Sequence, residues 1–330
     1  MMFSQRKPIA LPADAPPQLL VVVDTEEDFD WHAPPDRANN GVASMLHIDR
    51  VQTICNDYGL APCYVVDYPV ASQPDGYRLL KQYFSAGQCE IGAHLHPWVN
   101  PPFDEPVTVA NTYPGNLPMA LEREKLRILR DQIAEVFGAV PTTYKAGRYG
   151  FGPHTEETLA ALGFEIDVSV CPPFDHRGDG GPDYRAFSAD PFWFGASRCL
   201  EIPLTGALVG RAGQYARPLY DAAQRAKRFK APGILARLGL VDRLVLSPEG
   251  FAFNDHKRLT EFLLKQGVRT FTWSFHSPSV LPGCTPYVRN ERDLQQFLER
   301  FKRFFDYFFN ELGGQATTPT RLKAQWESLQ

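Results

Sequence analysis

Cysteine is scarce in this sequence, and the few cysteines that occur are widely separated. The 330 residues include six of them and no CxxC pair. This spacing argues against both a dense disulfide framework and a zinc–thiolate site. We therefore expect six free thiols, as is usual for a protein in a reducing compartment.

The chain also lacks a long apolar run and a strong excess of one charge. Its first apolar run, residues 19–23, is too short for a signal-peptide core or a membrane span. The formal net charge of −4 gives no global signal for nucleic-acid binding. These features predict a cytoplasmic protein with no membrane span and no nucleic-acid partner.

The sequence does contain a globular composition in which short and long segments alternate. Apolar residues make up 44% and charged residues 22%, close to globular averages, and 330 residues suffice for one large α/β domain. Short β-branched runs predict strands at 19–24, 62–67, 89–94, 142–146, 165–170, 244–246 and 268–276. Apolar residues spaced three and four apart predict helices at 43–58, 76–86, 118–137, 154–162, 255–266 and 291–312. This alternation indicates βα units with parallel strands.

Polar residues stand where several of the predicted strands end. Asp24, Asp67, His94 and His276 all occupy such positions. In α/β barrels and open sheets, chemistry gathers at the C-terminal ends of the strands. The placement favours a functional site at one end of the sheet. Glu249, after another short strand, could line the same face, although loop or cap roles fit Asp67 and Glu249 equally well.

The first predicted strand ends in a dense acidic cluster. Asp24, Glu26, Glu27 and Asp28 place four carboxyl groups within five residues, and their mutual repulsion favours a neighbouring positive charge. A divalent cation or an arginine would supply that charge. The alternative is a solvated acidic loop.

Two histidines, His94 and His96, follow the third predicted strand with one residue between them. Side chains two residues apart on an extended segment point to the same side, so both imidazoles can reach one metal ion. Zinc and similar metals favour imidazole nitrogen together with carboxylate oxygen. The alternative is an ordinary strand end that carries two histidines.

An arginine and a further histidine also lie near strand ends. Arg148, in the turn 147–150, stays charged and can orient a carboxylate through two hydrogen bonds. His276, at the end of the last predicted strand, could act as a general acid or base. A surface arginine and a structural histidine are the alternatives.

These residues, in this order, resemble the motifs of the polysaccharide deacetylase family, also called carbohydrate esterase family 4 or the NodB-homology family. The similarity spans residues 18–312, with DTEEDF at 24–29, HLHPW at 94–98 and SFHSPS at 274–279. The resemblance implies an α/β fold, a distorted (β/α) barrel of about seven parallel strands. We expect an N-terminal arm over 1–17, a basic helical insertion near 208–243 and a C-terminal tail over 313–330 that forms either an arm or a loosely ordered segment.

By the same resemblance, five residues take roles at the site. Asp24 matches the aspartate that acts as the catalytic base, and His276 matches the histidine that acts as the general acid. Arg148 matches the arginine that steadies the base, and Asp167 matches the aspartate that partners that arginine. His94 matches the first metal-binding histidine.

The sequence departs from the family pattern at two positions. The family has adjacent aspartates, the second a metal ligand, but here Thr25 follows Asp24. The ligand must then come from one of the three acidic residues that follow, and strand alternation favours Glu26. The family's second histidine lies four residues after the first, where this chain has Trp98. His96 can replace it if the strand stays extended.

The resemblance implies a metal-dependent hydrolase that removes N-acetyl groups from a sugar or polysaccharide, so the expected partner is an N-acetylated glycan. The expected cofactor is a divalent metal, zinc foremost, with nickel, cobalt or manganese as other candidates. Amidohydrolases of the same superfamily that work without metal offer an alternative, as does a glycosidase with paired carboxylates. A third alternative is a carbohydrate-binding protein without catalysis, which the presence of both Asp24 and His276 disfavours.

A basic segment at residues 211–243 is not accounted for by these motifs. It contains eight lysines and arginines and only two aspartates. Such a stretch could bind an anionic glycan, a sugar diphosphate or, peripherally, a membrane surface. The alternative is a solvated helical insertion.

Overall fold

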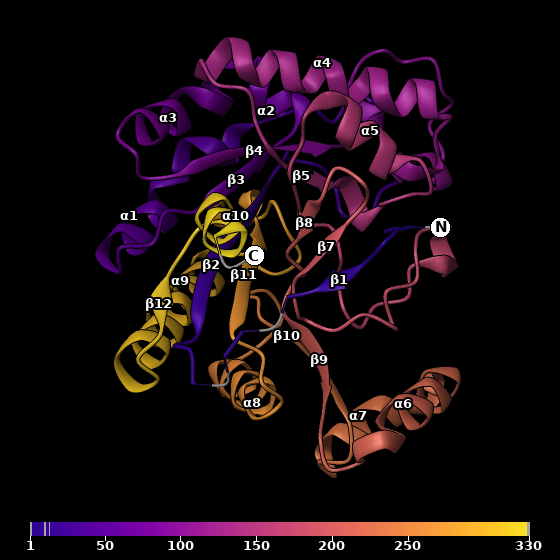
Figure 1. Cartoon of the computed structure of the whole chain (residues 1–330), viewed down its shortest axis with the longest axis vertical. Helices are drawn as coiled ribbons and strands as arrows, with labels where there is room; N and C mark the ends of the chain where they lie inside the picture. Colours follow the sequence, from indigo (N-terminus) through magenta and orange to yellow (C-terminus); the bar gives the residue numbers. More distant parts are fainter. Residues whose placement is uncertain (1, 10, 13, 329–330) are drawn as a thin grey trace.

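A curled sheet with helices around it forms the body of the molecule, as the computed structural model shows for residues 2–9, 11–12 and 14–328 (Figure 1). Within these ranges, seven parallel strands form one continuous path in the spatial order β8, β6, β5, β4, β3, β2 and β11, and the short β12 (Gln315–Ala316) pairs parallel with β2 off this path. Their bounds are β2 Gln18–Thr25, β3 Cys63–Val66, β4 Glu90–Leu95, β5 Thr143–Ala146, β6 Ile166–Asp167, β8 Cys199–Glu201 and β11 Thr270–His276. The predicted α/β barrel of about seven parallel strands is confirmed.

The strand register brings the chemically interesting residues to one edge of the sheet. Asp24 on β2 lies opposite His276 on β11, and His94 on β4 lies opposite Lys145 on β5. Because these strands are parallel, their carboxyl ends meet at the same edge. Residues more than 250 positions apart in the chain thus become neighbours without any long loop reaching across.

Helices lie around the outside of this sheet and follow the predicted alternation. Their bounds are α1 Asp49–Asp57, α2 Tyr68–Ser72, α3 Pro74–Ser85, α4 Met119–Phe137, α5 Thr155–Leu162, α8 Phe253–Lys265 and α9 Glu291–Asp306. A π-helical turn at Tyr307–Glu311 extends α9. The apolar stripe of α9 packs on β11, where Trp273 stacks on Phe304 with ring centroids 4.8 Å apart. This packing anchors the strand that ends in His276.

One predicted strand pairs differently from expectation. Residues 244–246 were expected to join the parallel set, but β10 (Asp242–Val245) pairs antiparallel with β9 (Gly206–Val209). The seventh parallel strand is β8, three residues long, which shows no clear alternation in the sequence. Single hydrogen bonds join the edges of the barrel here, from Leu246 N to the Thr205 oxygen (2.8 Å) and from Ser274 N to the Leu246 oxygen (3.2 Å).

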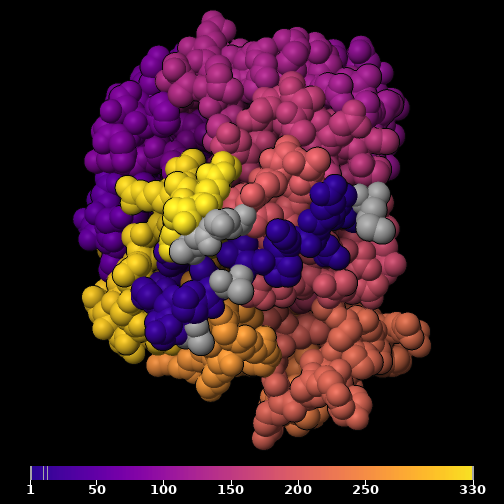
Figure 2. Space-filling view, in the orientation of Figure 1, coloured from indigo at the N-terminus to yellow at the C-terminus, as the bar shows by residue number. Residues whose placement is uncertain are grey.

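Two short helices separate β9 from β10. They are α6 (Ala216–Arg225) and α7 (Ala231–Arg237), and residues 211–241 are called the basic insertion below. In Figure 1 this insertion stands apart from the barrel beyond β9, and in Figure 2 it projects from the lower edge of the molecule. Its position therefore differs from that of the other helices, which lie against the sheet.

Both ends of the chain pack against the barrel. β1 (Lys7–Pro8) pairs with β7 (Phe192–Phe194). β12 (Gln315–Ala316) pairs with β2, and α10 (Pro319–Glu327) buries Leu322 and Trp326 against residues of the barrel interior. Residues 315–327 of the expected C-terminal tail are therefore ordered, and buried apolar side chains of α10 hold them to the barrel. Of the expected arm and tail, residues 1, 10, 13 and 329–330 lie outside the described residues.

Within the described ranges, no helix is both long and apolar enough to cross a membrane.

Candidate active site

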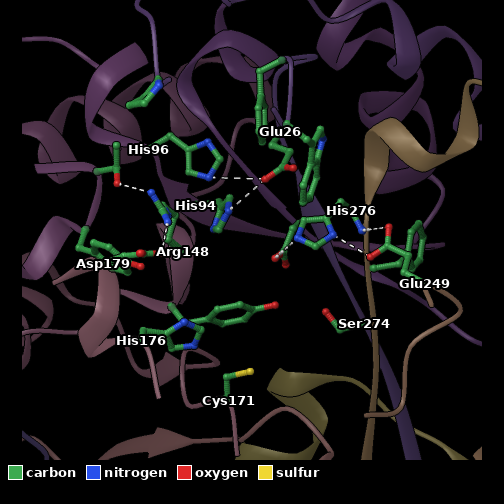
Figure 3. Close-up of a pocket in the computed structure, with 18 of the residues that line it drawn as sticks. Glu26, His94, His96, Arg148, Cys171, His176, Asp179, Glu249, Ser274 and His276 are labelled. Carbon is green, nitrogen blue, oxygen red and sulfur yellow. Dashed lines mark hydrogen bonds and ion pairs between the residues drawn. The ribbon is translucent and has the colours of Figure 1, made fainter. Parts of the chain in front are cut away.

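A cavity of about 600 Å³ opens at the carboxyl ends of the parallel strands. Its wall includes Asp24, Glu26, His94, His96 and His276. Figure 3 shows the last four of these around the cavity. All five were singled out from the sequence, and the structure brings them together. The cavity has the size of a small-molecule site, in which a few polar groups are set among aromatic side chains.

Glu26, His94 and His96 form a compact group of metal-donor atoms. Oε2 of Glu26 lies 3.7 Å from Nε2 of His94 and 3.5 Å from Nε2 of His96. All three side chains are only 2–3% exposed. Oε1 of Glu26 has no hydrogen-bond partner among the described residues, although it is buried. A buried carboxylate oxygen without a partner is costly, unless a cation or a ligand group completes the site.

Hydrogen bonds on the far side of each imidazole hold both histidines in the orientation that metal binding needs. Nδ1 of His94 donates to the backbone oxygen of Lys145 at 3.1 Å, and Nδ1 of His96 donates to Oε2 of Glu27 at 2.8 Å. These bonds place the proton on Nδ1, so Nε2 of each ring turns a lone pair toward Glu26. Glu27 is itself held, because its backbone N–H donates to Asp67 at 2.7 Å.

The electrostatics of the group favour a bound cation. Burial lowers the pKa of His94 well below its usual value and lowers that of His96 to about 4, so both rings are neutral. Burial, together with the charges of Glu27 and Asp24, raises the pKa of Glu26 well above its usual value. Two neutral imidazoles and a destabilised carboxylate make the nitrogen and oxygen donor set that zinc and similar ions bind. The residues present therefore fit a divalent metal.

A second set of potential donors, Glu27, Asp67 and His96, overlaps the first. Its atoms are already engaged: Asp67 accepts from the backbone N–H groups of Glu27 and Val70, and Glu27 accepts from His96. This second set therefore supports the first and does not compete with it for an ion.

The backbone around His96 is closely packed, which fixes the ring. His96 stacks on Trp98, with centroids 4.3 Å apart and planes 23° apart. On another side, Gly147 passes so close that an added Cβ would lie 2.6 Å from Cδ2 of His96 and 2.3 Å from the Leu95 oxygen. Glycine is required at 147 because any side chain would displace His96 or the end of β4.

A chain of alternating charges occupies the other side of the cavity. Nζ of Lys145 lies 2.5 Å from Oδ1 of Asp24, and Oδ2 of Asp24 lies 3.7 Å from Nε2 of His276. Nδ1 of His276 contacts Oε2 of Glu249 at 2.7 Å, and Glu249 also accepts from Ser279. The order cation, anion, cation, anion stabilises each charge by its neighbours.

These neighbours set the protonation states of the two central groups. Burial opposes ionisation of Asp24, but the positive charges of Lys145 and His276 outweigh it, and the pKa of Asp24 lies below its usual value. Burial also disfavours the charged form of His276, but Glu249 and Glu26 raise its pKa to about 10. At neutral pH the site therefore presents a carboxylate beside an imidazolium.

Arg148 does not contact Asp24, contrary to the role expected from the resemblance. Its guanidinium donates to Thr112 (2.9 Å) and Asp179 (3.2 Å) and lies over the ring of Tyr113. Figure 3 shows it directed toward Asp179 at the cavity wall. Its backbone is left-handed, with φ of 53°, a conformation that a non-glycine residue rarely adopts.

Asp167 does not contact Arg148 either. It accepts a hydrogen bond from Ser169 at 2.6 Å and lies opposite Glu201 in the pairing of β6 with β8, fully buried. Asp167 and Arg148 thus have separate partners in this structure.

Lys145 contacts Asp24, and Glu249 contacts His276. The family resemblance gave the contact with Asp24 to Arg148 instead. Lys145 lies inside the fully buried strand TYKA, and a lysine in such a strand is a signal that sequence reasoning could have used, because a buried lysine needs an anionic partner. Glu249 was noted only as a residue that could line the site.

Several solved structures share this fold, although sequence comparisons find no match. No family model matches the chain, and no curated protein matches it in sequence. A solved structure described as a candidate polysaccharide deacetylase from Mycobacterium smegmatis has a TM-score of 0.58 at 12% identity, covering 100% of this chain and 96% of that one. A probable polysaccharide deacetylase from Pseudomonas aeruginosa has a TM-score of 0.52 at 14% identity, covering 94% and 91%.

The Puue allantoinase is similar to the same degree, with a TM-score of 0.53 at 15% identity, covering 94% of this chain and 90% of that one. At such low identity these likenesses show the fold alone. The chain therefore has the (β/α) barrel fold of the polysaccharide deacetylases, as its motifs suggested, and Puue allantoinase shares that fold.

Proposed function

We propose that this protein is a metal-dependent hydrolase that removes the acetyl group from an N-acetylated sugar or glycan. The supporting observation is the meeting, in one cavity, of a buried nitrogen and oxygen donor set with the ion chain from Lys145 through Asp24 and His276 to Glu249. A carbohydrate-binding protein without catalysis has no need for a carboxylate and an imidazolium held 3.7 Å apart.

The metal would be held by Glu26, His94 and His96, and zinc is our first proposal, with nickel, cobalt and manganese as alternatives. When bound, such an ion polarises the amide carbonyl and lowers the pKa of a bound water. Glu27 and the Lys145 backbone oxygen keep the two imidazoles in the required tautomer.

The proton transfers are carried by Asp24 and His276. Asp24 is ionised at neutral pH and accepts a proton as water attacks the amide carbon; Lys145 fixes its Oδ1, so that Oδ2 remains available. Nε2 of His276 donates a proton to the departing amine nitrogen, while Glu249 holds the opposite ring nitrogen. The overall change is addition of water across the C–N bond, giving acetate and a free amine.

The substrate class is proposed from the fold together with the cavity. The two deacetylases above are described as acting on polysaccharides, and the cavity is lined with aromatic side chains suited to a ring-shaped ligand. Trp31 meets the ring of His276 edge-on at 4.9 Å and so lies beside the reacting groups. Six unpaired cysteines support our further proposal of a cytoplasmic location.

A direct test measures acetate release from a panel of N-acetylated sugars and oligosaccharides, with protein stripped by a chelator and then reloaded with zinc. We expect activity only after reloading, and elemental analysis should find about one ion per chain. Allantoin and simple amides without an acetyl group are the matched alternative substrates. Hydrolysis of these, with no acetate from the sugars, would replace deacetylation by amidohydrolase activity on the same scaffold.

A further inference from the structure

The basic insertion carries a charge opposite to that of the rest of the molecule. Residues 211–241 contain seven lysines and arginines and one aspartate, whereas the whole chain has 34 basic and 38 acidic residues. The insertion is therefore strongly positive, and the remainder of the chain is net negative. Such segregation gives the molecule one positive end.

Few of these charges are used inside the fold. Arg211 donates to the Leu238 oxygen, and Arg217 donates to the Arg185 oxygen. The single acidic residue, Asp221, pairs with Arg185 of the body at 3.3 Å. The five other basic side chains of the insertion have no acidic partner in the described chain, and all are exposed: Arg225, Lys227, Arg228, Lys230 and Arg237.

Large apolar side chains are exposed on the same segment. Tyr215 and Phe229 are each 66% exposed, Leu238 is 55% exposed and Ile234 is 50% exposed. These are four of the nine exposed large apolar residues in the described chain, although the insertion is less than a tenth of its length. Ile234 and Leu238 are one helical turn apart and so share a face. A merely solvated insertion would not gather apolar side chains there.

The insertion is nonetheless packed against the body of the protein at its base. Tyr220 and Ala223 of α6 are buried, and the guanidinium of Arg243 on β10 lies 4.2 Å from the centre of the Phe174 ring. Figures 1 and 2 show the helices projecting beyond the body. The exposed apolar and basic residues thus stand on a supported projection that a flat partner can reach.

We propose that the basic insertion docks the protein onto the surface of an anionic phospholipid bilayer. The unpaired basic side chains meet the headgroups, while Phe229, Ile234 and Leu238 enter the boundary between headgroups and acyl chains. The negative body is repelled by the same surface, which orients the molecule with the insertion toward the lipid. A second copy of this insertion would be repelled by like charge, and the phosphate backbone of intact duplex DNA presents no apolar layer comparable to the acyl chains for Ile234 and Leu238.

The test is co-sedimentation of the full chain with vesicles, either of phosphatidylcholine alone or with about 30% phosphatidylglycerol, an anionic surface like that of natural membranes. We expect binding to the anionic vesicles only, and its loss in high salt. Reversing three charges, with Lys227→Glu, Arg228→Glu and Lys230→Glu, should weaken binding by about 100-fold. Replacing three apolar residues, with Phe229→Ser, Ile234→Ser and Leu238→Ser, should weaken it by about 10-fold or more.

Matched controls separate docking from general charge. The variant with Lys81→Glu, Lys265→Glu and Lys302→Glu reverses three exposed lysines elsewhere and should bind like the wild type. Equal binding to both vesicle types, equal weakening by the two charge variants, or equally tight salt-sensitive binding to duplex DNA would overturn the proposal. So would a dimer, measured by light scattering, that the apolar variant abolishes. Acetate release from a soluble sugar should be unchanged in every variant, so this test is independent of the proposed activity.

Discussion

The two sides of the cavity treat charge in opposite ways. On the side of Glu26, the neighbouring imidazoles are neutral, the pKa of the carboxyl is raised by burial, and one of its oxygens lacks a partner. On the side of Asp24, every charge has an opposite neighbour, and the pKa values of Asp24 and His276 move apart. The side of Glu26 lacks a compensating positive charge, whereas on the side of Asp24 each charged group has a neighbour of opposite charge.

This difference assigns separate tasks to residues that lie two positions apart on one strand end. An incomplete donor group is suited to receive an ion, whereas a compensated ion chain is suited to hold and move a proton at fixed pH. Changes on the first side should therefore alter metal binding, and changes on the second side should alter proton transfer while leaving metal binding intact.

The largest effect is expected from Asp24→Asn. The amide cannot accept a proton, so kcat for acetate release should fall by about 1000-fold. Elemental analysis should find unchanged metal content, because the donor atoms of Glu26, His94 and His96 are untouched. Thermal unfolding checks that the variant folds with Lys145 uncompensated. An active Asp24→Asn protein would remove Asp24 from the reaction.

Removal of a donor tests the other side. His94→Ala should weaken zinc binding, measured by calorimetric titration of the stripped protein, by about 100-fold. His154→Ala, which changes an exposed histidine far along the chain, is the matched control and should bind zinc normally. Unchanged zinc affinity in His94→Ala would show that the ion, if any, binds elsewhere.

Lys145 and Arg148 can be compared directly. Since the charge of Lys145 lowers the pKa of Asp24, Lys145→Met should raise that pKa and move the acid limb of the kcat/KM profile to higher pH, with a loss of about 10- to 100-fold at neutral pH. Arg148→Met removes a similar cation that contacts Asp179 instead and should leave the acid limb in place. The reverse result would restore the role that the resemblance gave to Arg148.

The smallest effect concerns Glu249. Because Glu249 and Glu26 together raise the pKa of His276 to about 10, the alkaline limb of the wild-type profile should lie near that pH. Glu249→Gln should move the alkaline limb to lower pH by about 1–2 pH units.

The raised pKa of His276 also contributes to the stability of the fold. This contribution is complete at pH values below the ordinary histidine pKa, and it is lost as the pH rises through about 10. Urea unfolding of Glu249→Gln should accordingly show a weaker loss of stability over that range.

Much of the barrel could be predicted from the sequence, because apolar strands end at polar residues. Apolar runs that stop at Asp24, His94 and His276 located three parallel strands and the edge where they meet. The short strand β8 was missed because three residues are too few to show a period. Residues 244–246 were misplaced because pairing direction depends on distant partners, here β9.

Side-chain partners were harder to predict than positions. Arg148 and Lys145 are three residues apart, but Lys145 contacts Asp24, whereas Arg148, with a left-handed φ of 53°, donates to Thr112 and Asp179. A resemblance in motif order does not encode that dihedral angle. Asp167 lay in the right strand for its expected role, but its carboxyl turns toward Ser169 and the neighbouring β8.

The way in which β9 and β10 attach the basic insertion to the barrel sets the distance between the cavity and a surface to which the insertion binds. β9 and β10 run from the insertion directly into the barrel wall, and Val245 at the end of β10 lines the cavity. No flexible spacer intervenes, so the height of the cavity above a docked surface is set by the length of a short, hydrogen-bonded hairpin. If the insertion docks as proposed, this rigid connection would hold the mouth of the cavity at one fixed height above the bilayer.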